Sequence, residues 1–317
     1  GGSNILNSIK VCTMTPLQTR IQNLQRKVKT PLTGEFDATT TNAFLNFLKI
    51  AVPAQADLKT RKELIQKHVG FTGKDVDGLI GPSTVSRLEL LFSTDLPAIP
   101  SGASLIASKK SLDIIVESEV SSKAIYEKKY KSPVVPGEDS GVTIGIGYDI
   151  GHVSPATFAN DWKAFIPAAA FNLLNGAVGK KQTAAKQALT PQVKAVSIEW
   201  NTALEVFYTR SMPAWAKKAG KMYPGLEKLP PDAQGAIVSL VYNRGESLSA
   251  KDSRLEMRNL VGLIAGGNLK KIADEIRKMK RLWSAAVSPG LHIRRDREAN
   301  LVENADFMLL PNDYIFI

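Results

Sequence analysis

Apolar residues recur every three or four positions along most of the chain, which is the spacing that places them on one face of a helix. Helix starts are predicted at Pro155 and Pro191, because each proline follows a Ser or Thr that can cap the first turn. The glycine pair 266–267 predicts a helix end, and residues 269–282 predict a basic amphipathic helix. One glycine-rich stretch, residues 141–151, breaks this pattern, so we expect a mainly α fold with one small β element.

Residues 141–151 alternate with the period of two that is typical of a β-strand. One face of such a strand would carry Val142, Ile144, Ile146, Tyr148 and Ile150. The other face would carry Thr143, Gly145, Gly147, Asp149 and Gly151. The glycines of this second face would let a ligand approach the backbone closely. A straight strand would hold Thr143 and Asp149 about 20 Å apart, at roughly 3.3 Å per residue, so joint action at one site requires a bend near Gly145 or Gly147, as in a hairpin.

Residues 111–126 predict one amphipathic helix with an acidic residue inside its apolar stripe. The stripe consists of Leu112, Ile115, Val116 and Tyr126. Glu119 lies within the stripe, whereas Glu117 lies on the polar side. Burial disfavours the charged form of a carboxyl group and raises its pKa, and a general acid that works near neutral pH needs such a shift. Glu119 is therefore a candidate general acid; the alternative is that it pairs with a buried arginine or caps a neighbouring helix.

Two segments near the start of the chain, residues 21–48 and 64–91, form a weak internal repeat. In each copy, a helix start that contains Gln is followed by a Gly-containing turn and then by a Thr-rich start to a second apolar helix. In the second copy, Ser83 or Thr84 is expected to cap that second helix.

The second copy also contains the pattern Asp-Gly, then Gly-Pro, then Thr, at Asp77, Gly78, Gly81, Pro82 and Thr84. In this pattern it resembles the peptidoglycan-binding domain family, a small three-helix module. The resemblance implies that the segment binds bacterial cell wall, with Asp77 and Gly78 at the contact. The first copy lacks the Gly-Pro pair, which leaves wall binding by that copy open. The alternative is a helical adaptor in which the Asp-Gly turn is purely structural.

Length and charge narrow the classes of protein. The chain has 317 residues, enough for two ordinary domains, and 94–108 reads as a linker because it is rich in Pro, Gly and small residues. The formal charge is +11. Residues 1–100 hold 12 Lys and Arg against 8 Asp and Glu, which gives +4, and the remainder gives +7. Such a charge favours a polyanionic partner, for which wall polymers, anionic lipid and nucleic acid all qualify.

Several other classes are disfavoured. No apolar run reaches the roughly 18 residues that a transmembrane helix needs. Cys12 is the only cysteine, so an intramolecular disulfide or a thiolate cluster is excluded. The three histidines, at positions 68, 152 and 292, lack metal-ligand spacing, and we expect no metal and no cofactor. A nucleic-acid partner is not expected, because basic residues are not interleaved with aromatic ones.

Four segments of the second half resemble the phage-type lysozyme superfamily, in the expected order. They are VESEVSSKAIY (116–126), TIGIGYDIG (143–151), GAIVSLVYNRGES (235–247) and GLHIRRDREANL (290–301). The resemblance implies a helical domain with a small β element that hydrolyses the bond between N-acetylmuramic acid and N-acetylglucosamine. It places the general acid at Glu119 and the family's threonine at Thr143. Together with the wall-binding repeat, it is typical of a modular phage endolysin.

The chain departs from the commonest members of that superfamily at the aspartate. Those members carry Asp nine residues after the Glu, where this chain has Lys128. The spacing instead resembles the pesticin-like branch, in which an Asp follows the threonine. Asp149 fits that pattern, and Asp139 is the alternative second carboxylate. In the expected mechanism, Glu119 protonates the glycosidic oxygen while Asp149 and Thr143 hold the attacking water.

Three further residues of the matched segments are candidate substrate contacts. Tyr148 is expected to contact sugar if it turns toward the cleft, and Asn243 and Arg294 are expected to line the cleft, with structural hydrogen bonding as the alternative. The predicted organisation is a small helical binding domain, a linker and an α+β lysozyme-like domain with a small β-hairpin or sheet, over residues 4–93, 94–108 and 109–317.

The expected function is therefore that of a monomeric muramidase acting on bacterial peptidoglycan, without a nucleic-acid partner or stable membrane insertion. The sequence shows no signal segment. We expect the protein in the host cytoplasm, from which it would be released to the cell wall, or else on a virion. The alternatives are a lytic transglycosylase that uses Glu119 alone, a pesticin-like toxin and a non-catalytic cell-wall-binding protein.

Overall fold

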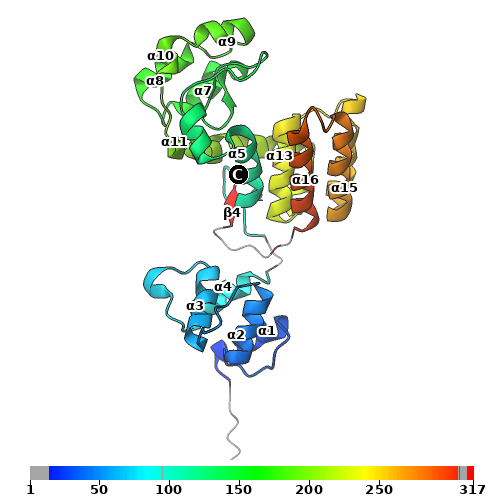
Figure 1. Ribbon diagram of the computed structural model, residues 1–317. Coiled ribbons are helices and arrows are strands. Elements are labelled where there is room, and N and C mark those ends of the chain that lie inside the picture. Colours follow the sequence, from blue (N-terminus) through cyan, green and yellow to red (C-terminus); the bar gives the residue numbers. More distant parts are fainter. Residues whose placement is uncertain (1–13, 94–95, 306, 308–312) are drawn as a thin grey trace, which may run out of the picture. The chain divides into compact units, whose positions relative to one another are not determined.

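The computed structural model describes residues 14–93, 96–305, 307 and 313–317; Cys12 and the first ten residues of the predicted binding domain lie outside them. The chain divides into two compact units: of the described residues, 14–93 and 307 belong to the first unit, and 96–305 and 313–317 belong to the second (Figure 1). About 60% of the chain is helical, and the strands of the described part form two small antiparallel sheets of two strands each. The predicted mainly α fold with a small β element is confirmed. Among the described helices, none has both the length and the apolar character needed to cross a bilayer.

The first unit is built from four helices, α1 (Pro16–Lys27), α2 (Ala38–Phe47), α3 (Leu58–His68) and α4 (Pro82–Leu90). The two copies of the repeat correspond to the pairs α1–α2 and α3–α4. Helix α1 packs against α4, and α2 packs against α3, so the two copies share one core. Phe44, Ile65 and Leu88 are fully buried in that core.

A buried glutamine holds the turn of the second copy together. The Oε1 atom of Gln66 accepts hydrogen bonds from the backbone N–H groups of Asp77 (3.0 Å) and Gly78 (2.8 Å). Its Nε2 atom donates to Asp77 Oδ1 (2.9 Å) and to the carbonyl of Leu79 (3.0 Å). Gly78 has a φ of +73°, and a Cβ atom there would lie 2.6 Å from Lys59 Cγ. The Asp-Gly pattern therefore serves the folding of this turn.

The first copy contains the same arrangement around Gln25, which is fully buried. Its Oε1 atom accepts from the N–H of Gly34 (3.1 Å), and its Nε2 atom donates to the carbonyl of Glu35 (2.9 Å) and to Thr40 Oγ1 (2.8 Å). The first copy therefore folds like the second without the Gly-Pro pair. The predicted caps were wrong, since α4 begins at Pro82 behind Gly81 and no side chain caps it.

A Gln66→Leu variant is expected to destabilise the first unit by about 2–4 kcal/mol, because the backbone N–H groups of Asp77 and Gly78 lose their acceptor. Gln55→Leu, at an exposed position of the same unit, is the control. All four tryptophans lie in the second unit, at positions 162, 200, 215 and 283. In the Gln66→Leu variant, amide hydrogen exchange should therefore rise in residues 14–93. The unfolding midpoint of the second unit, measured by tryptophan fluorescence, should not change. Unchanged exchange in the first unit would contradict the role given to Gln66.

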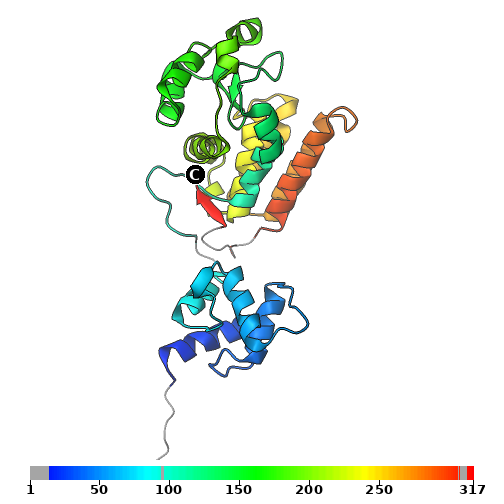
Figure 2. The same ribbon diagram turned by 60° about the vertical axis from the view of Figure 1, so that its left-hand side comes forward.

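The second unit is organised around helix α13 (Pro231–Arg244), whose residues 231–241 are all buried. Helices α5 (Lys109–Val120), α12 (Met212–Met222) and α16 (Pro289–Glu303) pack on it, as Figures 1 and 2 show. Gly235 lets α5 approach closely, because a Cβ atom at this position would overlap the side chain of Ser111. The glycine that begins the matched segment 235–247 thus has a packing role.

A two-stranded sheet closes this unit near the end of the chain. Strand β1 (Ile106–Ser108) pairs antiparallel with β4 (Tyr314–Phe316), and its three residues are buried. The backbone N–H of Ile106 also donates to Gln234 Oε1 at 2.9 Å. The predicted linker 94–108 is therefore too long, because residues 106–108 belong to the second unit. The pattern of small residues gave no sign of β1, whose partner lies at the other end of the sequence.

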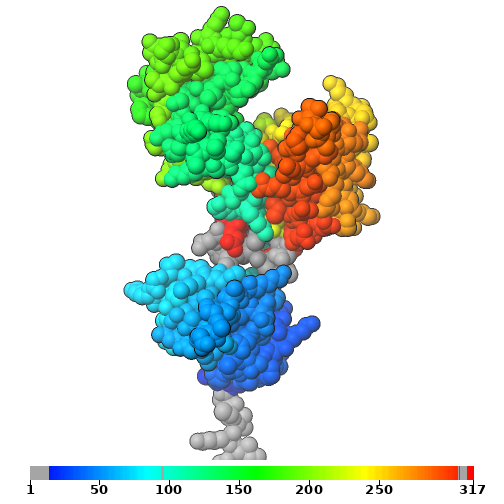
Figure 3. Space-filling model, viewed as in Figure 1, coloured from blue at the N-terminus to red at the C-terminus, as the bar shows by residue number. Residues whose placement is uncertain are grey.

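Most elements of the second unit, apart from α5, α12 and the β1–β4 sheet, form two lobes. The hairpin lobe, residues 122–211, contains α6 (Lys123–Ile125), a π-helical turn (126–130), β2 (Thr143–Ile144), β3 (Tyr148–Asp149), α7 (Pro155–Trp162), α8 (Ala168–Asn175), α9 (Gln182–Ala188), α10 (Pro191–Lys194) and α11 (Trp200–Val206). The helical lobe contains α13, α14 (Leu255–Gly266), α15 (Leu269–Lys278) and α16. The surface is hollowed between the green hairpin lobe and the yellow-to-red helical lobe (Figure 3).

Most of the predicted helix boundaries are confirmed. Ser154 and Thr190 cap helices that begin at Pro155 and Pro191, and α14 ends at a left-handed Gly267. The predicted single helix 111–126 was wrong. It ends at Val120, because Ser121 adopts a φ of +64°, and Ser122 caps the next short helix. Tyr126 therefore lies on a separate element, where its hydroxyl donates to the carbonyl of Ile198 at 2.7 Å.

Candidate active site

Glu119 lies on the last turn of α5. Leu112, Ile115 and Val116, which precede it on the apolar face, are buried in the core. Glu119 itself is half-buried, whereas Glu117 is exposed and forms an ion pair with Arg297 at 2.6 Å. Among the described residues, the Glu119 carboxyl has no hydrogen-bond or ion-pair partner. Glu117 and Glu119, two residues apart on this helix, thus occupy opposite environments.

The glycine-rich segment forms a hairpin. Strands β2 and β3 pair antiparallel, with Thr143 opposite Asp149 and Ile144 opposite Tyr148. The chain turns through left-handed Gly145 and Gly147, with φ values of +56° and +62°, where the bend was predicted. Directly opposed residues of an antiparallel pair point to the same face, with Cβ atoms about 4.5–5.5 Å apart. The hairpin therefore brings Thr143 and Asp149 together.

The tip of this hairpin lies against Glu119. A Cβ atom on Gly147 would lie 2.5 Å from Glu119 Oε2 and 2.9 Å from its Cδ. The hydroxyl of Tyr242, on α13, donates to the carbonyl of Gly147 at 3.4 Å. The site is thus assembled where α5, α13 and the hairpin lobe meet.

The surroundings of Glu119 favour the protonated form of its carboxyl group. Burial raises the pKa of Glu119, and the positive charge of Arg294 opposes part of that rise. Burial, followed by the negative charge of Glu119, raises the pKa of Tyr242. Tyr242 therefore remains a neutral phenol beside the carboxyl. Sequence reasoning missed Tyr242, although it directly precedes Asn243 in the matched segment 235–247.

Asp149 is held by its own hairpin. Its carboxylate accepts hydrogen bonds from the N–H groups of Gly141 (3.0 Å) and Gly151 (2.8 Å), and it pairs with His152 Nδ1 at 3.0 Å. A Cβ atom at Gly141 would overlap this carboxylate, and one at Gly151 would overlap the carbonyl of Lys180. These two glycines therefore serve the packing of the hairpin. For Gly151 this differs from the expectation that the glycines of that face let a ligand approach the backbone.

Thr143 and Tyr148 occupy opposite faces of the hairpin. The Thr143 hydroxyl is half-buried and donates to the carbonyl of Gly141 at 3.3 Å. The Tyr148 hydroxyl donates to Asp161 Oδ2 at 2.6 Å, and its ring packs edge-on against Trp162. The placement of Tyr148 does not support the predicted sugar contact, because its hydroxyl and ring are both engaged with α7.

Arg294 and Asn243 belong to a buried ionic network beside the site. Arg294 pairs with Glu298 at 3.2 Å, and Arg295 pairs with the same carboxylate at 2.7 Å. Arg295 also donates to Asn243 Oδ1 at 2.8 Å. This network carries one negative and two positive charges, so a positive charge remains close to Glu119. Asn243 thus makes a structural hydrogen bond, which was the alternative to its expected place in the cleft lining.

The remaining predicted residues lie elsewhere. Asp77 and Gly78 belong to the first unit, where Gln66 holds both. Asp139 is exposed and accepts a hydrogen bond from Gln182 Nε2 at 3.0 Å. In the described part of the chain, no group of three His, Cys, Asp or Glu side chains is arranged to hold a metal ion.

Comparison with known protein families adds one match. Residues 122–222 match the model of a domain of unknown function, DUF8812. The segment that matches DUF8812 begins three residues after Glu119 and covers the hairpin lobe and α12, so it contains Thr143 and Asp149. No curated protein matches the chain.

Proposed function

We propose that the chain is a muramidase that hydrolyses the β-1,4 bond between N-acetylmuramic acid and N-acetylglucosamine in bacterial peptidoglycan. The observation that carries this proposal is the environment of Glu119, a half-buried carboxyl with a raised pKa that lies against the tip of a glycine hairpin, where α5, α13 and the hairpin lobe meet. The ordered resemblance of four segments to phage-type lysozymes supports the same chemistry.

In this mechanism Glu119 donates its proton to the glycosidic oxygen as the bond to the anomeric carbon breaks. The carboxylate left behind is stabilised by the neighbouring positive charge of Arg294. Thr143 and Asp149, opposed on the hairpin, would hold the water that attacks the anomeric carbon. The water gives its hydroxyl group to the new reducing end and its proton to Asp149, which releases the proton to solvent, and Glu119 regains a proton from solvent.

A lytic transglycosylase is the second candidate, and the state of Asp149 favours it. Two backbone N–H groups and His152 already engage this carboxylate, which leaves it less free to activate water. In a scheme with Glu119 as the single acid and base, the hydroxyl of the muramic acid itself attacks the anomeric carbon. The product then carries an anhydro end.

Mass spectrometry of digested peptidoglycan tests both candidates at once. Reducing muramic ends support the muramidase, and anhydro ends support the transglycosylase. Release of free peptides would replace both with an amidase or peptidase. Absence of any product, with unchanged binding to wall sacculi, would favour a non-catalytic wall-binding protein.

The raised pKa of Glu119 predicts how activity depends on pH. Activity should fall as pH rises through that pKa, because the acid loses its proton. Arg294→Met should move this fall in activity to higher pH, since the positive charge that lowers the pKa of Glu119 is removed. Arg294→Lys, which keeps the charge, is the control. The measurement is kcat/KM against pH on soluble muropeptides. If activity falls at the same pH in the wild type, Arg294→Met and Arg294→Lys, the assignment of Glu119 is contradicted.

The first unit would hold the enzyme on the wall. A pocket of about 420 Å³ lies beside the turn of its second copy, bordered by Asp77, Ser83 and Thr84. In this proposal the protein acts as a monomer, is made in a bacterial host and reaches the wall at lysis or on a virion.

A further inference from the structure

A pocket of about 400 Å³ lies in the hairpin lobe between α8, α9 and α10. Its polar wall is made by Asn172, Lys180, Gln187 and Thr190, and its apolar wall includes Leu173 and Val193. This volume falls within the range of about 300–1,000 Å³ of small-ligand sites. The side chains combine one cation, amide donors and acceptors, and small aliphatic contacts, and none of the described lining residues is aromatic.

The surface around this pocket carries unbalanced positive charge. Residues 162–198 contain five lysines and no Asp or Glu. The described part of the structure shows no ion pair for any of the five, which are Lys163, Lys180, Lys181, Lys186 and Lys194. The segment that forms the pocket thus carries a formal charge of +5, and positive charge attracts anionic ligands.

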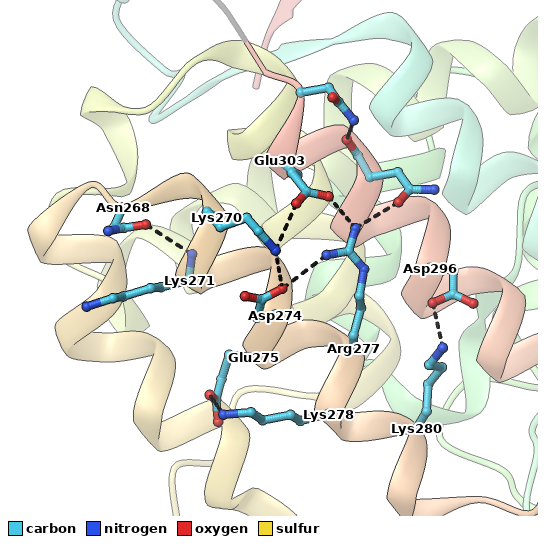
Figure 4. Close-up of polar contacts among 12 residues, drawn as sticks. Asn268, Lys270, Lys271, Asp274, Glu275, Arg277, Lys278, Lys280, Asp296 and Glu303 are labelled. Carbon is cyan, nitrogen blue, oxygen red and sulfur yellow. Dashed lines mark hydrogen bonds and ion pairs between the residues drawn. The ribbon is translucent and has the colours of Figure 1, made fainter.

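The basic helix α15 differs in this respect. Acidic neighbours pair with Lys270, Arg277 and Lys278 of this helix and with Lys280 just beyond its end, as Figure 4 shows. Asp274 and Glu303, for example, lie on either side of Lys270 at 2.9 and 3.1 Å. Most cations of this basic segment therefore form ion pairs within the protein, whereas the residues that the structure describes show no ion pair for the five lysines of residues 162–198.

Backbone hydrogen bonds join the segment that lines the pocket to the hairpin of the candidate active site. The N–H of Gly179 donates to the carbonyl of Ile150 at 3.0 Å, and the N–H of Gln182 donates to the carbonyl of Ser140 at 3.2 Å. Between these bonds, the carbonyl of Lys180 lies so close to Gly151 that no Cβ atom would fit there. A ligand held at Lys180 is therefore positioned relative to the strands that carry Thr143 and Asp149.

We propose that this pocket, with Lys180 as its anion-binding group, binds the acidic stem peptide that is attached to the glycan of peptidoglycan. The inference rests on the proposed function, and it assigns the substrate's peptide to a site of its own. Lys180 pairs with a peptide carboxylate, Asn172 and Gln187 bond to the peptide amides, and Leu173 and Val193 contact the alanine side chains. A nucleic acid fits less well, because single-strand sites use aromatic side chains for stacking.

Binding is measured with the soluble stem tetrapeptide as the probe, by titration calorimetry on the full chain carrying Glu119→Gln. Lys180→Gln in this background should raise the dissociation constant about tenfold, the effect of one charge-assisted hydrogen bond. Lys186→Gln, which removes an equal charge from α9 outside the pocket lining, should change it less than twofold. Lack of binding, or equal effects of the two substitutions, would overturn the proposal, as would tighter competition by a short single-stranded DNA.

Kinetics with otherwise wild-type chains give a second readout. Lys180→Gln should raise KM on intact peptidoglycan and leave it unchanged on glycan strands from which an amidase has removed the peptides. An equal rise on both substrates would contradict a peptide site. If no substrate is cleaved but the tetrapeptide still binds through Lys180, the muramidase proposal fails while the binding site stands, so the two failures are distinguishable.

Discussion

A Glu119→Gln variant is expected to lose at least about a hundredfold of its activity on peptidoglycan, the low end of what a general acid contributes. The amide keeps the shape of the side chain and removes the transferable proton. The measurement is the rate of turbidity loss of permeabilised Gram-negative cells, together with the release of soluble muropeptides. Either enzymatic candidate requires this loss, because both use Glu119 as the acid.

Glu117→Gln is the matched control, because it makes the same change two residues earlier on the same helix. Glu117 is exposed, and its ion pair with Arg297 lies on the surface, so activity should stay within about twofold. Lysis by Glu119→Gln at the rate of Glu117→Gln would remove Glu119 from the mechanism.

The same Glu119 variant should not lose stability at neutral pH. The raised pKa means that the folded state binds this proton more tightly than the unfolded state. The stability that the protonated carboxyl contributes is present below the unfolded pKa and is lost as pH rises through the folded pKa. A neutral amide avoids that loss, so thermal unfolding above the folded pKa should occur at the same or a higher temperature.

A Gly147→Ala variant is expected to lower activity by about ten- to a hundredfold, because small displacements of a catalytic group have effects of this size. The added Cβ atom would lie 2.5 Å from Glu119 Oε2, so either the carboxyl or the hairpin must move. The left-handed backbone at this position, with a φ of +62°, adds about 1–2 kcal/mol of strain for a residue with a side chain.

Gly267→Ala separates displacement from strain. Gly267 has a similar φ of +69° at the end of α14, and a Cβ atom there would meet no atom within 4 Å. Both variants should lose similar stability in urea, but only Gly147→Ala should lose kcat. Equal activity of the two alanine variants would show that the hairpin tip does not position Glu119.

Local pattern was sufficient for much of the candidate site. The alternation of residues 141–151 placed Thr143 and Asp149 on one face, and the glycines marked where the chain had to bend for the two residues to meet. That outcome depends on backbone preferences of neighbouring residues, which the order of amino acids records directly. The contrast between Glu119 and Glu117 followed in the same way from the helical period.

Other features depended on contacts between distant segments. Strand β1 was missed because its partner β4 lies near the end of the chain, and the break at Ser121 was missed because a serine rarely adopts a positive φ. Local spacing also could not show that Asp149 would be held by Gly141, Gly151 and His152.

The sequence by itself determined most helix starts, the position of the bend in residues 141–151 and which acidic residue faces the core, because these depend on periodicity and on backbone conformation over a few residues. Only the tertiary structure decided what surrounds Glu119. The tip of the hairpin at Gly147, the phenol of Tyr242 and the charge of Arg294 come from three separate segments. A carboxyl pKa depends on burial and on charges nearby in space, and chain folding alone brings those groups together.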